Sequence, residues 1–405
     1  REYRRTNKKL YSKSKRKIES EVNLLMLKGY KYRIYPTKEQ EIQLNKTFGS
    51  CRFVYNQLLA KKIELYKEEQ KSLSKTDCNN YCNRELKKEY LWLKEVDKFA
   101  LTNSIYDLDS AYQNFFRRIK KGSKELGFPK FKSKRNHNYS YKTNFTNNNI
   151  KVDFDNNKIQ LPKLKWIKCK LHRKFKGKIL FATISKTPSN KYFVSFNVEV
   201  EHEIISKNNN MIGFDLGIKE FLIDTNNNHI DNPRVLKQYE DKLTKLQRQL
   251  AHKDKGSNNF KKQCVKIARV HEKITNIRKD FQHKLSNEII KDNQIIISED
   301  LQISNMVKNH NLAKAIQDVA WGEFTRQLQY KAEWNNRIYH KINPWFASSQ
   351  LCSECGAKNK EVKCLSIREW VCPDCGAIHQ RDENASKNIL RQGLLELGMN
   401  KENIA

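Results

Sequence analysis

The sequence predicts a multidomain α/β protein, and three observations lead to that prediction. The chain has 405 residues, which is room for two to three domains of ordinary size. Short apolar runs that suit strands, such as residues 211–217 and 294–300, alternate with a long helical pattern over residues 235–292. An asparagine-rich polar segment, residues 205–210, separates two parts of the chain and is typical of a domain boundary.

Before this boundary, the sequence predicts strands and two long helices. Apolar residues recur at helical spacing from Thr37 to about residue 68 and again from about 98 to 120. Strand patterns occupy residues 27–35, several short stretches of 127–178, and a hairpin formed by 179–187 and 191–200.

After the boundary, strands and helices alternate. Residues 211–217 and 220–224 are expected to form a hairpin, and residues 235–292 two charged helices separated by 253–259. The remaining expected elements are a strand over 294–300, a helix over 321–338, a strand over 340–346 and a final helix from about Asp382.

The charge of the chain indicates its partner. Lys and Arg total 79 against 45 Asp and Glu, so the formal net charge is +34 and the pI is about 9.7. A polyanion would relieve this self-repulsion, which favours nucleic acid. No apolar run is long enough to span a membrane, and residues 1–25 form a basic N-terminal extension without a signal-peptide core. We therefore expect no membrane partner and a cytoplasmic location.

Four of the ten cysteines have the spacing of a zinc ribbon. They form two Cys-x-x-Cys pairs with 16 residues between them, and each pair is followed by Gly356 or Gly376. The four are Cys352, Cys355, Cys372 and Cys375. Four thiolates satisfy tetrahedral Zn²⁺ without an open position, which predicts a structural site. Cys364 lies between the pairs and is not expected to be a ligand, and a redox Cys-x-x-Cys is the alternative interpretation.

Three acidic residues occupy positions that suit a metal centre. Asp215 lies at the end of one apolar strand, Glu299 ends a second, and Asp382 opens the last helix. Each alone would more often be a surface acid or a helix cap. Together they can converge and hold two Mg²⁺ ions about 3.5–4 Å apart, an arrangement that cleaves phosphodiesters. Bound metals would also remove the repulsion between these carboxylates and phosphate.

Several motifs resemble TnpB, the RNA-guided nuclease encoded by insertion sequences and related to type V CRISPR effectors. The resemblance extends over roughly residues 26–395 in the order of that family. The motifs are YKYRIYPTKEQ (30–40), GFPKFKSKR (127–135), GFDLGIK (213–219), HEKITNIRKDFQHKLS (271–286), ISEDLQI (297–303), SSQLCSECG (348–356), WVCPDCG (370–376) and RDENASKNIL (381–390).

The resemblance implies a RuvC nuclease domain of RNase H-like fold with an inserted zinc ribbon. A β-barrel wedge domain, interrupted by a helical recognition domain, would precede it. The implied division is extension 1–25, wedge 26–37 and 126–205, helical domain 38–125, nuclease 206–347 and 379–405, and zinc ribbon 348–378. Asp215, Glu299 and Asp382 would be the catalytic, metal-binding acids. Gln380 and Glu383 depart from the pattern, because the family often has an acid and an apolar residue there.

The implied activity is RNA-guided DNA cleavage next to a short target-adjacent motif, by a single RuvC site. The implied cofactors are two Mg²⁺ ions, for which Mn²⁺ could substitute, and a structural Zn²⁺. The implied partners are a guide RNA from the transposon end and target double-stranded DNA, with the protein acting as a monomer or weak dimer. Tyr32, Arg33 and Tyr35 are candidates for reading the motif, although the tyrosines could instead pack inside the barrel.

Three other functions remain open. A guided DNA-binding repressor would bind without cutting, but the presence of all three acids argues against it. A DNA transposase could use similar metal chemistry and would act on element ends without a guide. A structural zinc-ribbon protein would explain the cysteines and the charge but would leave the three acids without a purpose.

Overall fold

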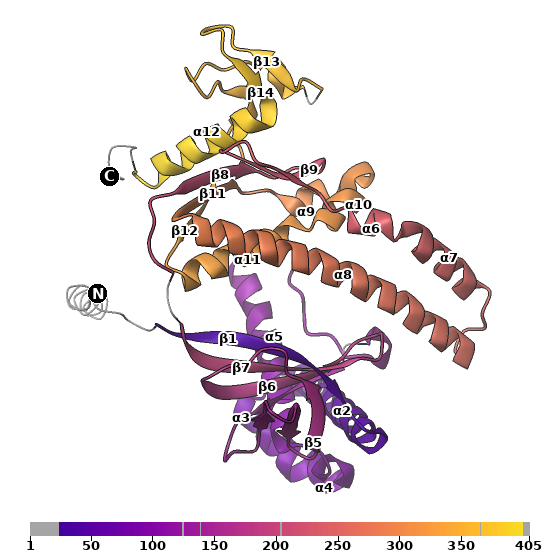
Figure 1. Ribbon diagram of the computed structural model, residues 1–405. Coiled ribbons are helices and arrows are strands. Elements are labelled where there is room, and N and C mark those ends of the chain that lie inside the picture. Colours follow the sequence, from indigo (N-terminus) through magenta and orange to yellow (C-terminus); the bar gives the residue numbers. More distant parts are fainter. Residues whose placement is uncertain (1–23, 124, 138, 203–204, 365, 400–405) are drawn as a thin grey trace, which may run out of the picture. The chain divides into compact units, whose positions relative to one another are not determined.

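The computed structural model describes residues 24–123, 125–137, 139–202, 205–364 and 366–399 (Figure 1). Nearly all of the predicted extension 1–25 lies outside these residues. The described chain divides into two compact units, one covering Leu24–Glu201 and one containing the chain from His202 onward. This division falls just before the polar segment 205–210 that the sequence predicted as a boundary.

The N-terminal unit contains a seven-stranded sheet in the order β2-β6-β7-β1-β5-β4-β3. Its strands are β1 (Leu24–Tyr35), β2 (Tyr139–Asn144), β3 (Lys151–Asp153), β4 (Lys158–Leu161), β5 (Lys165–Lys170), β6 (Lys178–Lys186) and β7 (Tyr192–His202). The predicted hairpin is confirmed, because β6 and β7 pair antiparallel with Ser185 opposite Phe193. Closure of this sheet into a barrel stays a prediction, since the order ends on β2 and β3.

Helices interrupt this sheet between β1 and β2. They are α2 (Lys38–Glu69), α3 (Lys75–Tyr81), α4 (Lys87–Glu89) and α5 (Lys98–Lys120), with a π-helical turn at Cys82–Leu86 and 3₁₀ turns at Leu91–Lys94 and Lys134–Asn136. Both predicted long helices are confirmed. Thr37 caps α2, because its side chain accepts from the Gln40 amide while the Gln40 side chain accepts from the Thr37 amide.

The C-terminal unit is built on a mixed five-stranded sheet in the order β10-β9-β8-β11-β12. Its strands are β8 (Met211–Asp215), β9 (Glu220–Asp224), β10 (His229–Asp231), β11 (Ile295–Glu299) and β12 (Ile338–Ile342). β8, β9 and β10 pair antiparallel, whereas β11 lies parallel to β8 and β12. The predicted strand 340–346 is shifted, because Asn343 opens a turn and Pro344 has no amide to donate.

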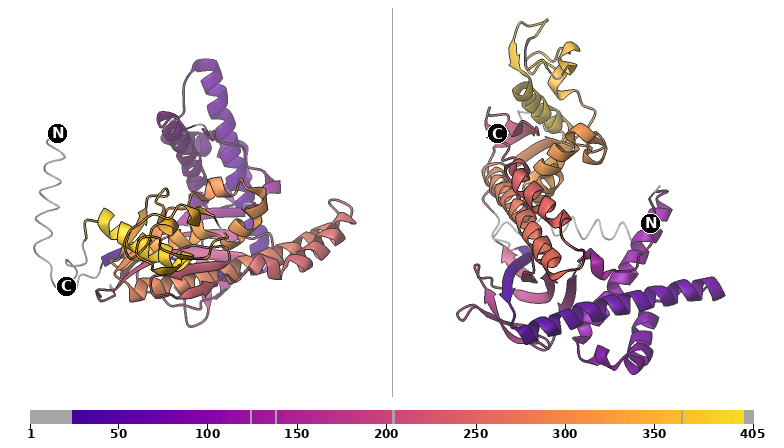
Figure 2. Two further views of the ribbon diagram at one scale, coloured as in Figure 1. Left: turned by 90° about the horizontal axis from the view of Figure 1, so that it is seen from above. Right: turned by 90° about the vertical axis from the view of Figure 1, so that its right-hand side faces the viewer.

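Helices cover both faces of this sheet (Figure 2). They are α6 (Val235–Gln238), α7 (Glu240–Ala251), α8 (Asn258–Asp292), α9 (Ile303–Met306), α10 (His310–Val319), α11 (Trp321–Trp334) and α12 (Arg381–Glu396). On one face, Phe214 and Phe221 pack with Phe324 of α11 and with α8 and α10. On the other, Ile297 packs with Ile389 of α12. Within the described residues, every helix is too short or too polar to span a lipid bilayer.

A small module lies between β12 and α12. It contains the two-stranded sheet β13 (Glu369–Val371) with β14 (Ile378–Gln380) and 3₁₀ turns at Ser348–Gln350 and Glu361–Lys363. Its apolar core includes Val362 and Trp370 together with two of its cysteines, Cys352 and Cys372.

Two glycines allow α12 to approach the sheet closely. A Cβ on Gly213 of β8 would lie 2.6 Å from the Leu390 Cβ and 2.8 Å from the Ser386 carbonyl oxygen of α12. A Cβ on Gly393 of α12 would lie 2.2 Å from the side chain of Ile297. The close packing of helix on sheet therefore depends on the absence of a side chain at both positions.

The Gly213→Ala substitution is expected to destabilise the protein by about 1–3 kcal/mol, because the added methyl group must push the α12 backbone outward. Chemical denaturation would measure the change. Gly322→Ala in α11 is the matched control, since its Cβ would meet only the Ile303 Cδ1 atom at 3.4 Å. Equal stabilities of the two variants would contradict this packing argument.

Candidate active site

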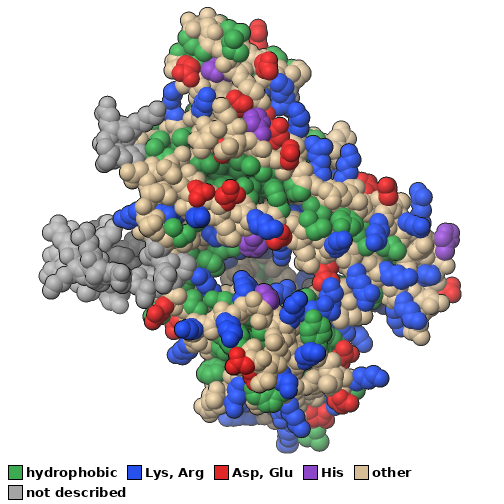
Figure 3. Space-filling view, in the orientation of Figure 1, with side chains coloured by type: hydrophobic (Ala, Val, Ile, Leu, Met, Phe, Trp, Pro, Cys, Tyr) green, Lys and Arg blue, Asp and Glu red, His purple; other side chains and the backbone are tan. Residues whose placement is uncertain are grey.

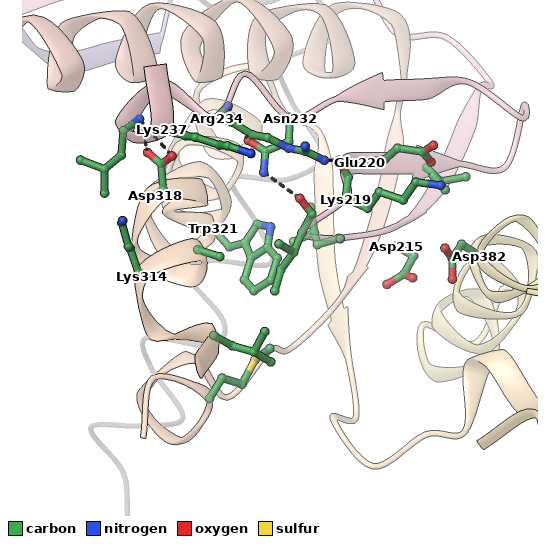
Figure 4. Close-up of a pocket in the computed structure, with 18 of the residues that line it drawn as sticks. Asp215, Lys219, Glu220, Asn232, Arg234, Lys237, Lys314, Asp318, Trp321 and Asp382 are labelled. Carbon is green, nitrogen blue, oxygen red and sulfur yellow. Dashed lines mark hydrogen bonds between the residues drawn. The ribbon is translucent and has the colours of Figure 1, made fainter. Parts of the chain in front are cut away.

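The sheet brings Asp215 and Glu299 to one edge. β8 and β11 are parallel neighbours with Phe214 opposite Ser298, so the residues that end the two strands leave the sheet side by side. Asp382 is the second residue of α12, which packs across β8. Figure 4 shows the carboxyl groups of Asp215 and Asp382 facing each other. Three predicted site residues from distant parts of the sequence thus meet at one place.

The electrostatics of this cluster are unfavourable without a cation. Burial, and then the charges of Glu299 and Asp382, raise the pKa of Asp215 from its usual value to about 7. Burial also raises the pKa of Glu299, against the effect of a hydrogen bond from Ser348. Clustered carboxylate oxygens are the ligands that Mg²⁺ prefers, and a divalent cation would remove their mutual repulsion. The residues present therefore fit a hard divalent metal.

Two neighbouring side chains orient these acids, and the sequence did not reveal either contact. The Ser348 hydroxyl donates to Glu299 Oε1. Arg368 Nη1 donates to Asp382 Oδ2 at 3.1 Å and supplies a positive charge beside it. Ser348 opens one of the motifs quoted above, but nothing in the sequence shows that it or Arg368 reaches an acid, because each does so from the 348–380 segment through tertiary packing.

The two departures from the family pattern both have partners. Gln380 caps α12, since its side-chain oxygen accepts from the amides of Asp382 and Glu383 at 2.8 Å each. Asp382 is therefore not the cap, and its carboxyl group is free to face Asp215. His229 bridges two carboxylates, with Nδ1 2.9 Å from Glu220 and Nε2 3.0 Å from Glu383. These hydrogen bonds raise the pKa of His229, and its imidazole links β10 to the first turn of α12.

A cleft of about 990 Å³ contains Asp215 and Asp382 and continues away from them between β9, α6 and α10 (Figure 4). Its basic lining consists of Lys219, Arg234, Lys237, Lys314 and Arg368. Lys and Arg side chains also gather over α7 and α8 (Figure 3). Exposed members there include Lys242, Lys245, Arg248, Lys261, Lys262 and Lys266. The same lining carries six acids, Asp215, Glu220, Glu240, Asp318, Glu369 and Asp382, so the cleft itself is not net basic. The exposed basic residues of α7 and α8 are the ones that can attract a phosphate backbone.

The four predicted cysteines form a second site. The Sγ atoms of Cys352, Cys355, Cys372 and Cys375 all lie within 4.8 Å of one another, so this group could hold a metal ion. Within the described residues, it is the one group of three or more potential ligands drawn together so tightly. Cys364 is exposed and lies outside the group, as the sequence predicted.

Both halves of this site have the same local structure. The Cys352 amide donates to the Ala357 carbonyl at 2.8 Å, and the Cys372 amide donates to the Ala377 carbonyl at 2.8 Å. Gly356 and Gly376 close the two turns with φ of 81° and 72°, which only glycine adopts easily. Two such knuckles facing each other are typical of a zinc ribbon.

Tyr32 and Tyr35 differ in their surroundings. Tyr32 is fully buried, and its hydroxyl donates to the Arg173 carbonyl at 2.8 Å, which favours packing over base reading. Tyr35 is exposed and lies against the Arg33 guanidinium. Direct reading of a motif by Arg33 and Tyr35 stays a prediction.

The raised pKa of Asp215 gives a stability test. Because the folded protein binds this proton more tightly than the unfolded chain, the contribution of Asp215 to stability should fall as pH rises from about 4 to about 7 and then level off. Asp215→Asn cannot ionise, so in chelator it should equal the wild type near pH 4 and exceed it by a few kcal/mol above pH 7. Free energies of unfolding across this range measure the difference. Equal free energies of unfolding for the wild type and Asp215→Asn at pH 8 would contradict repulsion between Asp215 and the neighbouring carboxylates.

Comparisons with known proteins agree with these observations. Residues 195–310 match the family model OrfB_IS605, described as "Probable transposase", and residues 321–389 match a Cas12f1-like TNB domain. Residues 26–71 match a model described as a helix-turn-helix domain. In this structure, that segment forms strand β1 and the single long helix α2.

Two relatives match nearly the whole chain. A protein of Streptomyces pristinaespiralis named "Putative RNA-guided DNA endonuclease" is 35% identical over 371 residues, which cover 91% of this chain and 89% of that protein. The "Putative RNA-guided DNA endonuclease InsQ" of Escherichia coli (strain K12) is 32% identical over 384 residues, which cover 91% of this chain and 92% of that protein.

The fold is shared with solved structures, among them a Cas12f1 chain. The Cas12f1 chain of a complex with single guide RNA and target DNA superposes with a TM-score of 0.56 at 13% identity. The match covers 90% of this chain and 98% of that chain.

Proposed function

The chain belongs to the TnpB family, and from this membership we propose that it is an RNA-guided DNA endonuclease that depends on divalent metal ions. It cuts target double-stranded DNA beside a short target-adjacent motif, using one RuvC-type site. Its guide is an RNA derived from the transposon end.

The convergence of Asp215, Glu299 and Asp382 carries this proposal. These carboxylates would hold two Mg²⁺ ions, for which Mn²⁺ could substitute, and such ions activate water and stabilise the leaving oxygen. Ser348 orients Glu299, and Arg368 stands beside Asp382 where it can also contact a phosphate. Arg234 and Lys237 line the cleft that leads to these acids, where they would hold the backbone of the strand being cut.

The fold supports a division into functional domains. We assign residues 26–37 and 126–205 to a wedge domain, since helices α2 to α5 enter its sheet between β1 and β2. Residues 38–125 form the helical recognition domain. Residues 206–347 and 379–405 form the RuvC nuclease, and its mixed sheet covered on both faces supports an RNase H-like fold. Residues 348–378 form a ribbon whose four clustered cysteines would hold Zn²⁺.

Guided recognition fits the charge of the protein. Base pairing between guide and target reads the sequence, so the protein needs many backbone contacts and few base contacts. A net charge of +34 and the exposed basic residues of α7 and α8 suit this role. The relatives named above as RNA-guided DNA endonucleases support the same partners.

A plasmid experiment separates this function from its rivals. The protein is copurified with its RNA, which is sequenced, and is then mixed in Mg²⁺ with plasmids that carry a guide-matched target beside randomised flanking bases. Guided cleavage predicts cut plasmids that share one flanking motif, and loss of cutting after RNase treatment. Binding to the same motif without cutting would indicate a guided repressor, and RNA-independent cutting at element ends would indicate a transposase.

A further inference from the structure

A short loop next to Glu299 carries an unusual side chain. Residues 343–347 connect β12 to Ser348, and both ends of this loop lie against Glu299. At one end, Ile342 of β12 lies opposite Glu299 of β11 in the sheet. At the other, the Ser348 hydroxyl donates to the Glu299 carboxylate. Trp345, at the middle of the loop, is three residues from Ile342, so its Cα lies at most about 11 Å from that of Ile342.

The loop backbone is held in place, yet Trp345 is not buried. Its amide donates to Asn343 Oδ1 at 2.9 Å, and the Phe346 amide donates to the Asn343 carbonyl at 3.1 Å. Phe346 packs into the cluster formed by β11, β12 and α12. Trp345 is nevertheless 87% exposed, which is the largest value among the bulky apolar side chains of the described residues. The fold therefore presents an exposed indole ring on the loop whose two ends contact Glu299.

We propose that Trp345 is a stacking platform for an unpaired nucleobase of the DNA strand being cut, an inference that rests on the proposed function. A phosphate placed at the acids brings its neighbouring bases within reach of this loop. An indole face can stack on any base, so such a contact needs no sequence preference. A single exposed ring presents too little area for a stable protein interface but matches the area of one base.

Three substitutions separate stacking from packing. Trp345→Ala and Trp345→Leu remove the aromatic ring, whereas Trp345→Tyr keeps a flat ring in the same place. Because Trp345 is exposed, none of them should disturb folding. We expect the alanine and leucine variants to lower kcat/KM for guide-matched DNA by roughly 5- to 100-fold, and the tyrosine variant to retain most of the activity.

DNA that lacks one base at a known position can identify the nucleobase that stacks on Trp345. Scanning single abasic positions along both strands near the cut should reveal one position that slows the wild type by a similar factor and leaves Trp345→Ala unaffected. Cutting by Trp345→Ala within twofold of the wild type would overturn the proposal, as would equal abasic profiles for the two proteins.

A crosslinking measurement does not require cleavage. DNA containing 5-iododeoxyuridine near the target is irradiated in the complete protein–RNA–DNA complex in Ca²⁺, and the modified peptide is identified by mass spectrometry. Crosslinks at Trp345 would support the stacking site even if the wild type did not cut, whereas crosslinks confined to other residues would contradict it. Failure of the wild type to cut any guide-matched DNA would instead count against the proposed function.

Discussion

Replacing Glu299 with alanine is expected to slow cleavage of guide-matched DNA by at least about 10³-fold, and Asp215→Ala and Asp382→Ala should do the same. Each substitution would remove one proposed ligand of the metal ions that activate water. The loss should appear in the rate of cleavage within the assembled complex, because the substitutions leave the Lys and Arg side chains of the cleft and of α7 and α8 in place. Single-turnover cleavage with preassembled complex measures the effect.

Asp300→Ala is the matched control for this prediction. Asp300 follows Glu299 directly, but its carboxylate points to Lys341 at 3.1 Å in an exposed ion pair. Such pairs contribute little, so the variant should cut at nearly the wild-type rate. Target binding by the three acid variants should remain near wild type. An equal loss of activity in the Asp300 and Glu299 variants, or an active Asp215→Ala protein, would contradict the assignment.

The second large effect is expected from loss of the cysteine site. Cys372→Ser should reduce bound zinc from one ion to none and should unfold residues 348–380, because structural Zn²⁺ contributes about 10–16 kcal/mol in small zinc domains. The damage should reach the active site. The Ser353 amide donates to Asn384 of α12 at 2.8 Å, and Arg368 contacts Asp382 at 3.1 Å. Metal analysis and cleavage assays measure the two consequences.

Cys364→Ser provides the control, because Cys364 is exposed and lies outside the cluster. This variant should keep one zinc per chain and the wild-type cleavage rate. If Cys372→Ser also retained zinc and activity, the four-cysteine site would not be a structural zinc site.

The sequence predicted those elements whose patterns are local. Apolar runs predicted β8 and β11, and each ends in a candidate acid because the buried run stops where the polar residue begins. Helical periodicity and the cap at Thr37 predicted α2, and turn residues predicted the hairpin of β6 and β7. In these segments, propensity and tertiary packing favour the same structure.

Other features depend on contacts between distant residues. α9 and α10 were missed, and the helix predicted over 321–338 ends at Trp334. The sequence did not show that His229 would pair with Glu383, 154 positions later, or that Ser348 would reach Glu299. The register of β8 against β11, which places Asp215 beside Glu299, also arises only when the sheet forms. The sequence therefore predicted that the three acids would converge, but it did not show which contacts and which strand register bring them together.

We propose that Asp215, Glu299 and Asp382 together hold the metal ions that cut DNA. Crystals of the protein–RNA–DNA complex grown with Mn²⁺ would test it most directly, since Mn²⁺ can be identified by its anomalous scattering. We expect two anomalous peaks about 3.5–4 Å apart, bounded by the three carboxylates and a phosphate of the target DNA. Mn²⁺ bound elsewhere on the protein, with these three acids in contact with no ion, would contradict it.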